Sequence, residues 1–269
     1  MREFALDLAM RAGELLLDYQ RRGRSRPLRS KSSHMDVVTE ADLAAEQLII
    51  AAIQERYPGH AIFAEESASA PGATLPDAEW VWYIDPVDGT TNYTHGLPMF
   101  AVNIGVAYQR VPVLGITHAP ALKCTYWGEQ GEGAWLRHDG GYRRLRVSRI
   151  PALEQALLAT GFPYDRGTSS DNNLAEFASL DLRSQAVRRL GTAALEMAWV
   201  ADGSLDGYWE NRAHAWDWLA GTVLVREAGG KVTDFAGRAW EPGMRRMLAS
   251  NGQAGIHEQM QAAITTARE

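Results

Sequence analysis

Apolar and charged residues near the N-terminus alternate with helical spacing. Apolar side chains recur there every three or four residues, at Phe4, Leu8, Ala12 and Leu15. This spacing predicts an amphipathic helix over residues 1–20 that turns one face toward a core. Thr39 and the acids after it are typical of a helix N-cap, so a second helix is predicted to run to about Tyr57. The basic segment from Arg21 to Ser33 is predicted to be a mobile, solvent-exposed connection.

Short apolar runs bounded by Gly and Pro dominate the next part of the chain and predict strands. These runs are Ala61 to Ala64, Trp80 to Ile84, Phe100 to Tyr108, Val113 to His118, Cys124 to Gly128 and Ala134 to Leu136. Because only short turn segments separate the later runs, we expect an antiparallel meander.

Strand and helix patterns alternate after Pro151. The predicted strands are Ala156 to Thr160, Ala186 to Arg188, Leu205 to Trp209 and Met247 to Ala249. The predicted helices are Asn173 to Leu180, Thr192 to Val200, Asp217 to Ala228 and Gln253 to Ala267. These patterns predict an α+β protein built of stacked layers rather than one doubly wound sheet. We expect a single unit over residues 1–269, with approximate subdomains 1–150 and 151–269.

Composition narrows the class of protein. Of the 269 residues, 46% are hydrophobic and 22% are charged, which is enough for a sizeable core. The formal charge of -6 argues against a general nucleic-acid binder. Acids interrupt the first apolar residues, which excludes an ordinary signal peptide, and no apolar stretch reaches the roughly 18 residues of a membrane span. Cys124 is the only cysteine, so we expect a cytoplasmic protein in which this side chain is a small buried hydrophobe.

The segment DPVDGTTN, residues 85–92, follows a predicted buried strand. A turn at Pro86 can aim Asp85 and Asp88 at one point, and carboxylate oxygens suit a hard cation such as Mg2+. Gly89 lets a backbone approach a ligand closely, and the amides at a helix start attract an anion. The segment therefore predicts a site for a metal ion and a phosphate. A surface turn is the alternative, because Asp, Pro and Gly dominate turns.

Four acidic groups lie where predicted elements begin or end. They are Asp42, the pair Glu65-Glu66, the pair Asp85 and Asp88, and Asp217. Taken singly, Asp42 or Asp217 could complement a helix dipole, and the glutamate pair could lie in an exposed loop. Taken together, they predict one site, because strand ends and helix starts tend to face the same crevice in layered α/β folds.

Several segments resemble the inositol monophosphatase family of metal-dependent, lithium-sensitive phosphatases. They are KSSHMDVVTEAD (31–42), FAEES (63–67), WYIDPVDGTTNYTHGLP (82–98), GTAALEMAWVADGSLDGYWE (191–210) and WDWLAGTVLVREAGG (216–230). Their order and spacing fit the family over nearly the whole chain. The resemblance implies a layered αβαβα sandwich, a homodimer, and hydrolysis of a phosphate monoester by water that two or three Mg2+ ions activate.

The resemblance also assigns roles to matching residues. It implies a first Mg2+ held by Glu65, Asp85 and the Val87 carbonyl, and a second held by Asp85, Asp88 and Asp217. The amides of Gly89 and Thr90 would hold the phosphate, and Thr90, hydrogen-bonded to Asp42, would help Glu65 to orient a water at the metal. Glu66 and Lys31 are further candidates near the metals, although Lys31 could equally be a solvated lysine. His95 and His214 are not needed as ligands.

The resemblance implies a phosphorylated polyol as substrate, myo-inositol monophosphate above others. Glu210 matches the family position that hydrogen-bonds a polyol hydroxyl, and Ala193 is a further expected substrate contact. The chain departs from the family at Ala64, where Gly is frequent, and at residues 211–215, which precede Asp217. Histidinol phosphate, fructose-1,6-bisphosphate and 3'-phosphoadenosine nucleotides are therefore alternative substrates.

The candidate cations for a second phosphate group are Arg188, Arg189 and Arg212. A role beside RNA polymerase in antitermination, in which catalysis is dispensable, is an alternative of another class. The catalytic hypothesis requires neither nucleic acid nor membrane as a partner.

Overall fold

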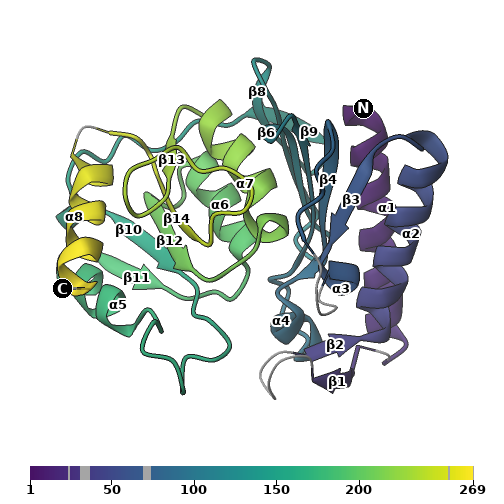
Figure 1. Cartoon of the computed structure of the whole chain (residues 1–269), viewed down its shortest axis with the longest axis horizontal. Coiled ribbons are helices and arrows are strands. Elements are labelled where there is room, and N and C mark those ends of the chain that lie inside the picture. The colour runs from purple at the N-terminus through teal and green to yellow at the C-terminus, as the bar shows by residue number, and fades with distance from the viewer. Residues whose placement is uncertain (24, 31–36, 69–73, 254, 269) are drawn as a thin grey trace.

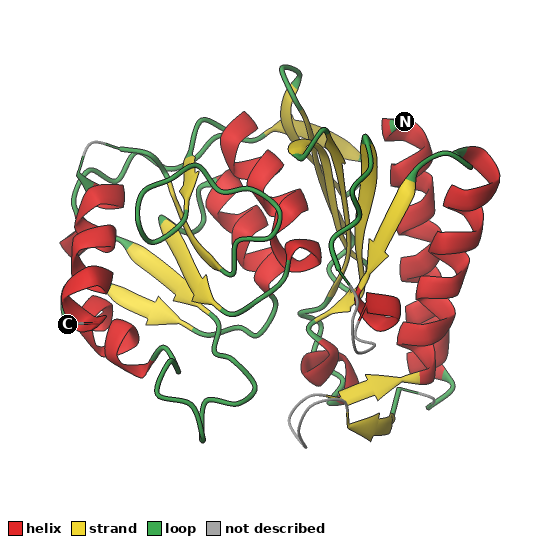
Figure 2. Cartoon of the chain, viewed as in Figure 1, coloured by secondary structure: helices red, strands yellow, loops and turns green. Residues whose placement is uncertain are grey.

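The computed structural model describes residues 1–23, 25–30, 37–68, 74–253 and 255–268. Five layers of alternating helices and sheets form the molecule, as the layers in Figures 1 and 2 show. The order across the molecule is a helix pair, a large sheet, a second helix pair, a smaller sheet and a third helix pair. The predicted αβαβα sandwich is therefore confirmed.

The helices cover both faces of each sheet (Figure 1). Their bounds are α1 Arg2–Arg21, α2 Glu40–Arg56, α3 Glu65–Ala68, α4 Thr90–Thr94, α5 Leu174–Asp181, α6 Ala193–Asp202, α7 Ala215–Glu227 and α8 Ile256–Arg268, with a 3-10 turn at Leu153–Gln155. Helices α1 and α2 pack on the outer face of the large sheet, α6 and α7 lie between the sheets, and α5 packs against α8.

The large sheet has the strand order β3-β4-β5-β6-β7-β8-β9. Its strands are β3 Ala61–Ala64, β4 Trp80–Asp88, β5 Ala101–Tyr108, β6 Val111–Ala119, β7 Cys124–Glu129, β8 Gly133–His138 and β9 Gly141–Arg144. All neighbours pair antiparallel except β3 and β4, which are parallel. The predicted meander is confirmed, and it includes β9, which the sequence pattern missed because all four of its residues are exposed.

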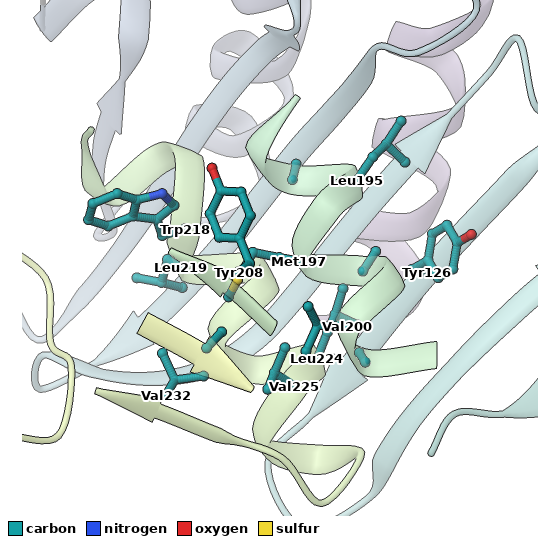
Figure 3. Close-up of a cluster of buried hydrophobic side chains, with 14 of the residues drawn as sticks. Tyr126, Leu195, Met197, Val200, Tyr208, Trp218, Leu219, Leu224, Val225 and Val232 are labelled. Carbon is teal, nitrogen blue, oxygen red and sulfur yellow. The ribbon is translucent and has the colours of Figure 1, made fainter. Parts of the chain in front are cut away.

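The smaller sheet has the order β11-β10-β12-β14-β13. Its strands are β10 Leu157–Thr160, β11 Ala186–Arg188, β12 Gly207–Asn211, β13 Lys231–Thr233 and β14 Arg246–Ser250. Strand β10 pairs parallel with both neighbours, whereas β14 pairs antiparallel with β12 and β13. This mixed sheet receives one face of α6 and α7, and Figure 3 shows apolar side chains such as Leu224, Val225 and Val232 filling the space between helices and strands.

A row of glycines crosses the large sheet beneath helix α7. Gly105 pairs with Gly115, and Gly115 pairs with Gly128 on the next strand. A Cβ atom on Gly115 would lie 2.3 Å from the carbonyl oxygen of Ala220, and one on Gly105 would lie 2.5 Å from the Leu219 side chain. The absence of side chains along this row therefore lets the backbone of α7 rest directly on the sheet.

Two expectations need correction. Part of the predicted mobile connection is a strand, because β1 (Pro27–Ser30) pairs antiparallel with β2 (Val37–Thr39). Cys124 is half-buried rather than fully buried, and its thiol lies 3.4 Å from the carbonyl oxygen of Leu122. None of the described helices is long and apolar enough to cross a membrane.

We expect Gly115→Ala to lower the free energy of unfolding by about 3 kcal/mol, because the new methyl group would clash with the α7 backbone. Urea unfolding followed by circular dichroism would measure the change. Gly128→Ala is the matched control on the same row, since its Cβ would make only ordinary contacts of 3.4 to 3.5 Å with Val223 and Leu224. Equal destabilisation by the two substitutions would contradict close backbone packing at Gly115.

We also expect acid to weaken the protein through His257, a buried residue of α8. Its ring nitrogens lie 2.8 Å from the Thr233 hydroxyl and 2.9 Å from the Ser250 hydroxyl. Burial, aided by the charge of Lys231, lowers its pKa from the ordinary 6.5 to about 4. The unfolded chain therefore binds the proton first, so this contribution is complete above pH 6.5 and is lost as pH falls toward 4, by about 3 kcal/mol.

Urea titrations at several pH values would measure this loss. His257→Gln should flatten the pH dependence, whereas His138→Gln, at a residue whose side chain is 48% exposed, should leave it unchanged. A wild-type slope that survives in His257→Gln would show that other groups cause the acid sensitivity.

Candidate active site

The candidate site lies at the end of β4, where the strand meets the short helix α4. The register of β4 against β5 shifts between Asp85 and Asp88, because Pro86 cannot donate a ladder hydrogen bond. The Val87 amide donates instead to the Asp85 carboxylate over 2.9 Å. This local turn aims both aspartates away from the ladder, and both side chains are buried.

Gly89 connects the strand end to α4 in a left-handed conformation. Its φ of 90° favours glycine, and a Cβ there would lie 3.0 Å from the Met99 carbonyl oxygen and 3.2 Å from that of Gly191. Asn92 tethers the same turn, since its amide group donates to the carbonyl oxygens of Met99 and Leu190 at 2.8 and 2.7 Å. Only glycine therefore fits the position that the sequence assigned to phosphate binding.

Asp42 is joined to this turn by the Thr90 hydroxyl. Asp42 lies in the first turn of α2, where one carboxylate oxygen accepts a hydrogen bond from the Thr39 amide at 3.0 Å. Its other oxygen accepts from Thr90 Oγ1 at 3.2 Å, so the expected Thr90–Asp42 bond is present. Thr90 Oγ1 also lies 3.0 Å from the Val87 carbonyl oxygen, which gives its single proton two acceptors.

Four carboxylates act on each other at the end of β4. Burial raises the pKa of Asp85 well above its usual range, and the charges of Glu65, Asp88 and Asp217 raise it further. Burial and then Glu65 raise the pKa of Asp217 in the same way. Burial raises the pKa of Asp88 to about 6, although hydrogen bonds from Thr192 and Ala194 oppose this shift. The structure thus brings together the acids of α3, β4 and α7 that the sequence analysis grouped.

The first turns of α6 and α7 hold Asp88 and Asp217 in place. The Ala194 amide donates to Asp88 at 2.7 Å, and the Thr192 hydroxyl donates to the same oxygen. Ala193, expected to contact substrate, is the first residue of α6 and lies between these two donors in the chain. Asp217 accepts a hydrogen bond from the His214 amide at the start of α7.

Asn103 is a positioning residue that the sequence analysis missed. Its amide nitrogen donates to the carbonyl oxygens of Trp216 and Asp217, at 2.7 and 3.1 Å. Its side-chain oxygen accepts from the Thr117 hydroxyl at 2.8 Å. The only signal in the sequence was a polar residue inside the apolar run that forms β5. The structure shows that this residue is fully buried.

Glu46 is a second missed residue, and it fixes the segment that carries Glu65 and Glu66. The Glu66 amide donates to the Glu46 carboxylate at 2.7 Å, and the Ser67 hydroxyl donates to its other oxygen. Burial raises the pKa of Glu46. Lys31, the other further candidate, lies outside the described residues.

Glu210 lies within reach of the charge on Asp88, at the end of β12. Burial raises its pKa to about 7, while a hydrogen bond from the Tyr208 hydroxyl and the charge of Arg189 oppose the shift. Gly161 makes room for it, because a Cβ on Gly161 would lie 2.0 Å from Glu210 Oε1. His214 stacks on Trp216 with ring centroids 4.2 Å apart, which leaves this histidine a packing role.

The donor set fits a hard divalent cation. The largest influences on Asp85 are burial and three neighbouring carboxylates, and all of them favour the protonated form unless a cation offsets the charge. In the described part of the chain, however, no three Asp, Glu, His or Cys side chains are arranged closely enough to hold a metal ion by themselves. A cation here would also take oxygens from the backbone, water or substrate, as Mg2+ commonly does.

Known proteins resemble this chain along most of its length. A family model described as "Inositol monophosphatase family" matches residues 1–269. An inositol-1-monophosphatase of Synechocystis is 38% identical over 262 residues, 97% of this chain and 88% of the relative. The Nus factor SuhB of Pseudomonas aeruginosa is 42% identical over 239 residues, 88% of this chain and 86% of that protein. The structure of an inositol monophosphatase from Anabaena matches with a TM-score of 0.84 and 38% identity, covering 98% of this chain and 94% of that one.

We expect Asp88→Asn to weaken Mg2+ binding at least about tenfold, because it removes one of the clustered negative charges while retaining the side-chain shape. Isothermal titration calorimetry would measure the affinity, and the rise in melting temperature with added MgCl2 would provide a second reading. Asp139→Asn is the matched control, since that side chain is 76% exposed. Equal Mg2+ affinity in both variants would exclude Asp88 as a ligand.

Proposed function

Because the chain belongs to the inositol monophosphatase family, we propose that it is a Mg2+-dependent phosphatase that hydrolyses myo-inositol monophosphate. The observation that carries this proposal is the mutual influence of Glu65, Asp85, Asp88 and Asp217 beside the Asp42–Thr90 hydrogen bond. Asp85 and Asp88 are buried, and Glu65 and Asp217 are partly buried beside them. Acids of α2, α3, β4 and α7 have no packing reason to lie together, so their proximity supports a role in binding cations and a phosphate.

We assign the metal ligands by the chemistry of their oxygens. Glu65, Asp85 and the Val87 carbonyl would hold one Mg2+, and Asp85, Asp88 and Asp217 would hold a second. When bound, the two cations offset the charge of the phosphate and lower the pKa of water toward neutrality. The remaining chemistry falls to side chains and amides of the chain itself.

Thr90 and Glu65 would hold the attacking water. The Thr90 hydroxyl donates its hydrogen bond to Asp42 or to the Val87 carbonyl oxygen, and this leaves the lone pairs of Thr90 Oγ1 available to accept a hydrogen bond from water. Glu65 would accept the other water proton and so fix the direction of attack on phosphorus. The amides of Gly89 and Thr90 would bind the phosphate oxygens, because the left-handed turn at Gly89 lets the backbone approach them closely.

Glu210 would select the substrate by accepting hydrogen bonds from ring hydroxyls of a polyol. Tyr208 and Gly161 support this role, the first by anchoring the carboxylate and the second by leaving space for it. The amide of Ala193 would contribute on the same side. The proposed enzyme acts in the cytoplasm as a homodimer, and phosphate esters of histidinol, fructose and 3'-phosphoadenosine remain competing substrates.

A second candidate function is a part in transcription antitermination beside RNA polymerase. The 42% identity to a protein named Nus factor SuhB favours it. Retention of RNA polymerase by immobilised Asp88→Asn protein would support this role independently of catalysis. Failure of both this variant and the wild type to retain polymerase would exclude it.

A substrate panel tests the proposed catalytic function. We expect wild-type protein with Mg2+ to prefer inositol 1-phosphate over glycerol 2-phosphate, histidinol phosphate, fructose-1,6-bisphosphate and 3'-phosphoadenosine 5'-phosphate, and to be inactive in EDTA. Gly161→Ala should lower kcat/KM for inositol 1-phosphate about 10- to 100-fold, because displacing Glu210 forfeits hydrogen bonds to a charged acceptor worth about 1.5–3 kcal/mol. Hydrolysis of p-nitrophenyl phosphate, which has no hydroxyls to bind, should change little.

Gly167→Ala is the matched control, because a Cβ on Gly167 would meet nothing within 4 Å. Glu210→Gln should reproduce the selectivity of Gly161→Ala. Full activity in EDTA would refute the metal-dependent mechanism, and an equal loss on every ester would refute substrate selection by Glu210.

A further inference from the structure

A cavity of about 630 Å³ lies beside helix α8. Its lining comes from α8, from the connection between β13 and β14, from Asp171 before α5 and from Arg212, the residue that follows β12. None of the acids assigned to the metals lines it. Its volume is typical of sites that enclose a small molecule.

Arginines dominate the lining of this cavity. They are Arg212, Arg238, Arg245, Arg246 and Arg268. The lining carboxylates are Asp171 and Asp234, and Asp165 and Glu176 also pair with lining arginines, so five arginines face four acids in a chain whose net charge is -6. Guanidinium groups at this density favour an anion, because each carries several donors in a planar fork.

The neighbouring acids only partly compensate these charges. Arg246 and Arg268 share Asp171, at 3.2 and 2.7 Å, and Arg238 pairs with Asp234. Arg268 also pairs with the buried Glu176 at 2.5 Å. Arg212 pairs with Asp165 at 2.8 Å.

Arg245 differs from the other four arginines. Within the described residues no carboxylate lies within ion-pair distance of its guanidinium group. That group donates instead to the Arg212 carbonyl oxygen and lies 3.4 Å from Nε2 of His214. Burial lowers the pKa of Arg245, and Asp217 opposes this through its charge without forming an ion pair. Arg245 is therefore the cation best placed to receive an external anion.

Apolar side chains line the cavity together with the arginines. Phe235 and Ile264 are both largely buried lining residues, and Met244 joins them. The guanidinium carbon of Arg268 lies 5.3 Å from the centre of the Phe235 ring. Charged and apolar groups therefore line the same cavity, as a small molecule with both kinds of group requires. A site for single-stranded nucleic acid would instead be a groove that follows an extended backbone.

We propose that this cavity binds a small phosphorylated molecule with an aromatic or aliphatic portion, its phosphate group at Arg245 and its apolar portion against Phe235. A phosphate monoester presents three acceptor oxygens and so can bond to Arg245 and to a neighbouring guanidinium group at once, which a carboxylate does less well. The site is separate from the proposed catalytic centre and does not depend on its activity.

Calorimetry with naphthylmethylphosphonate, whose C–P bond resists hydrolysis, tests the proposal. In EDTA at pH 8, we expect the wild type to bind it at least about tenfold more tightly than naphthylacetate, inorganic phosphate or naphthalenemethanol. Arg245→Gln should weaken phosphonate binding about tenfold or more, and Phe235→Leu should weaken it without changing phosphate binding. Arg11→Gln on α1, which removes an exposed arginine of equal charge, should have no effect.

Circular dichroism and melting temperatures would verify that every variant is folded, and Asp217→Asn would separate this cavity from the candidate active site. Because the negative charge of Asp217 acts on Arg245, unchanged or tighter phosphonate binding in Asp217→Asn supports a separate site, whereas loss of binding there overturns it. Absence of wild-type binding, or equal binding by wild type and Arg245→Gln, also overturns the proposal. Binding of a single-stranded RNA that depends on Arg245, without phosphonate binding, would overturn it in favour of a nucleic-acid surface.

Discussion

The close contact between helix α7 and the large sheet determines much of the structure. Gly105, Gly115 and Gly128 form a row without side chains, and the helix backbone rests on it. A helix held at this distance brings its first turn, with Asp217, toward the acids at the end of β4. Asn103 fixes the same approach through the carbonyl groups of Trp216 and Asp217. The packing of α7 on the large sheet therefore also determines the position of Asp217 in the candidate active site.

Burying several carboxylates together is costly, and the fold offsets only part of that cost. Asp88 receives hydrogen bonds from Thr192 and Ala194, and Asp217 receives one from His214. For Asp85, by contrast, the largest influences all favour protonation. Divalent cations held by these acids would offset the charge that the protein leaves uncompensated at Asp85, which is consistent with its proposed role as a metal ligand.

The sequence predicted the elements whose signals are local. Thr39 caps α2 as expected, and the segment from Asp85 to Asn92 forms the strand end and turn that its Pro and Gly indicated. Strands with exposed or polar residues, such as β1 and β9, gave no hydrophobic pattern and were missed.

Residues that act across the fold also escaped prediction. Gly161 matters only because Glu210 occupies the space beside it, and Asn103 only because α7 lies against β5. Glu46 supports the segment of Glu65 from a helix twenty residues earlier in the chain. Such roles depend on which segments, far apart in the sequence, lie close together in space. The spacing of residues along a single sequence does not give this information. The role of each carboxylate, as distinct from its position, stays a prediction.

The order of the acids along the chain has a consequence for synthesis. Asp42, Glu65, Asp85 and Asp88 precede the large sheet's later strands, whereas Asp217 follows most of the smaller sheet. A nascent chain on the ribosome could complete the large sheet while α7 has not yet been made, leaving the glycine row open to water and the early acids without their last partner. N-terminal segments fold first during synthesis. The proposed metal ligands would therefore be complete only after α7 has packed between the two sheets, so metal binding would be a late step of folding.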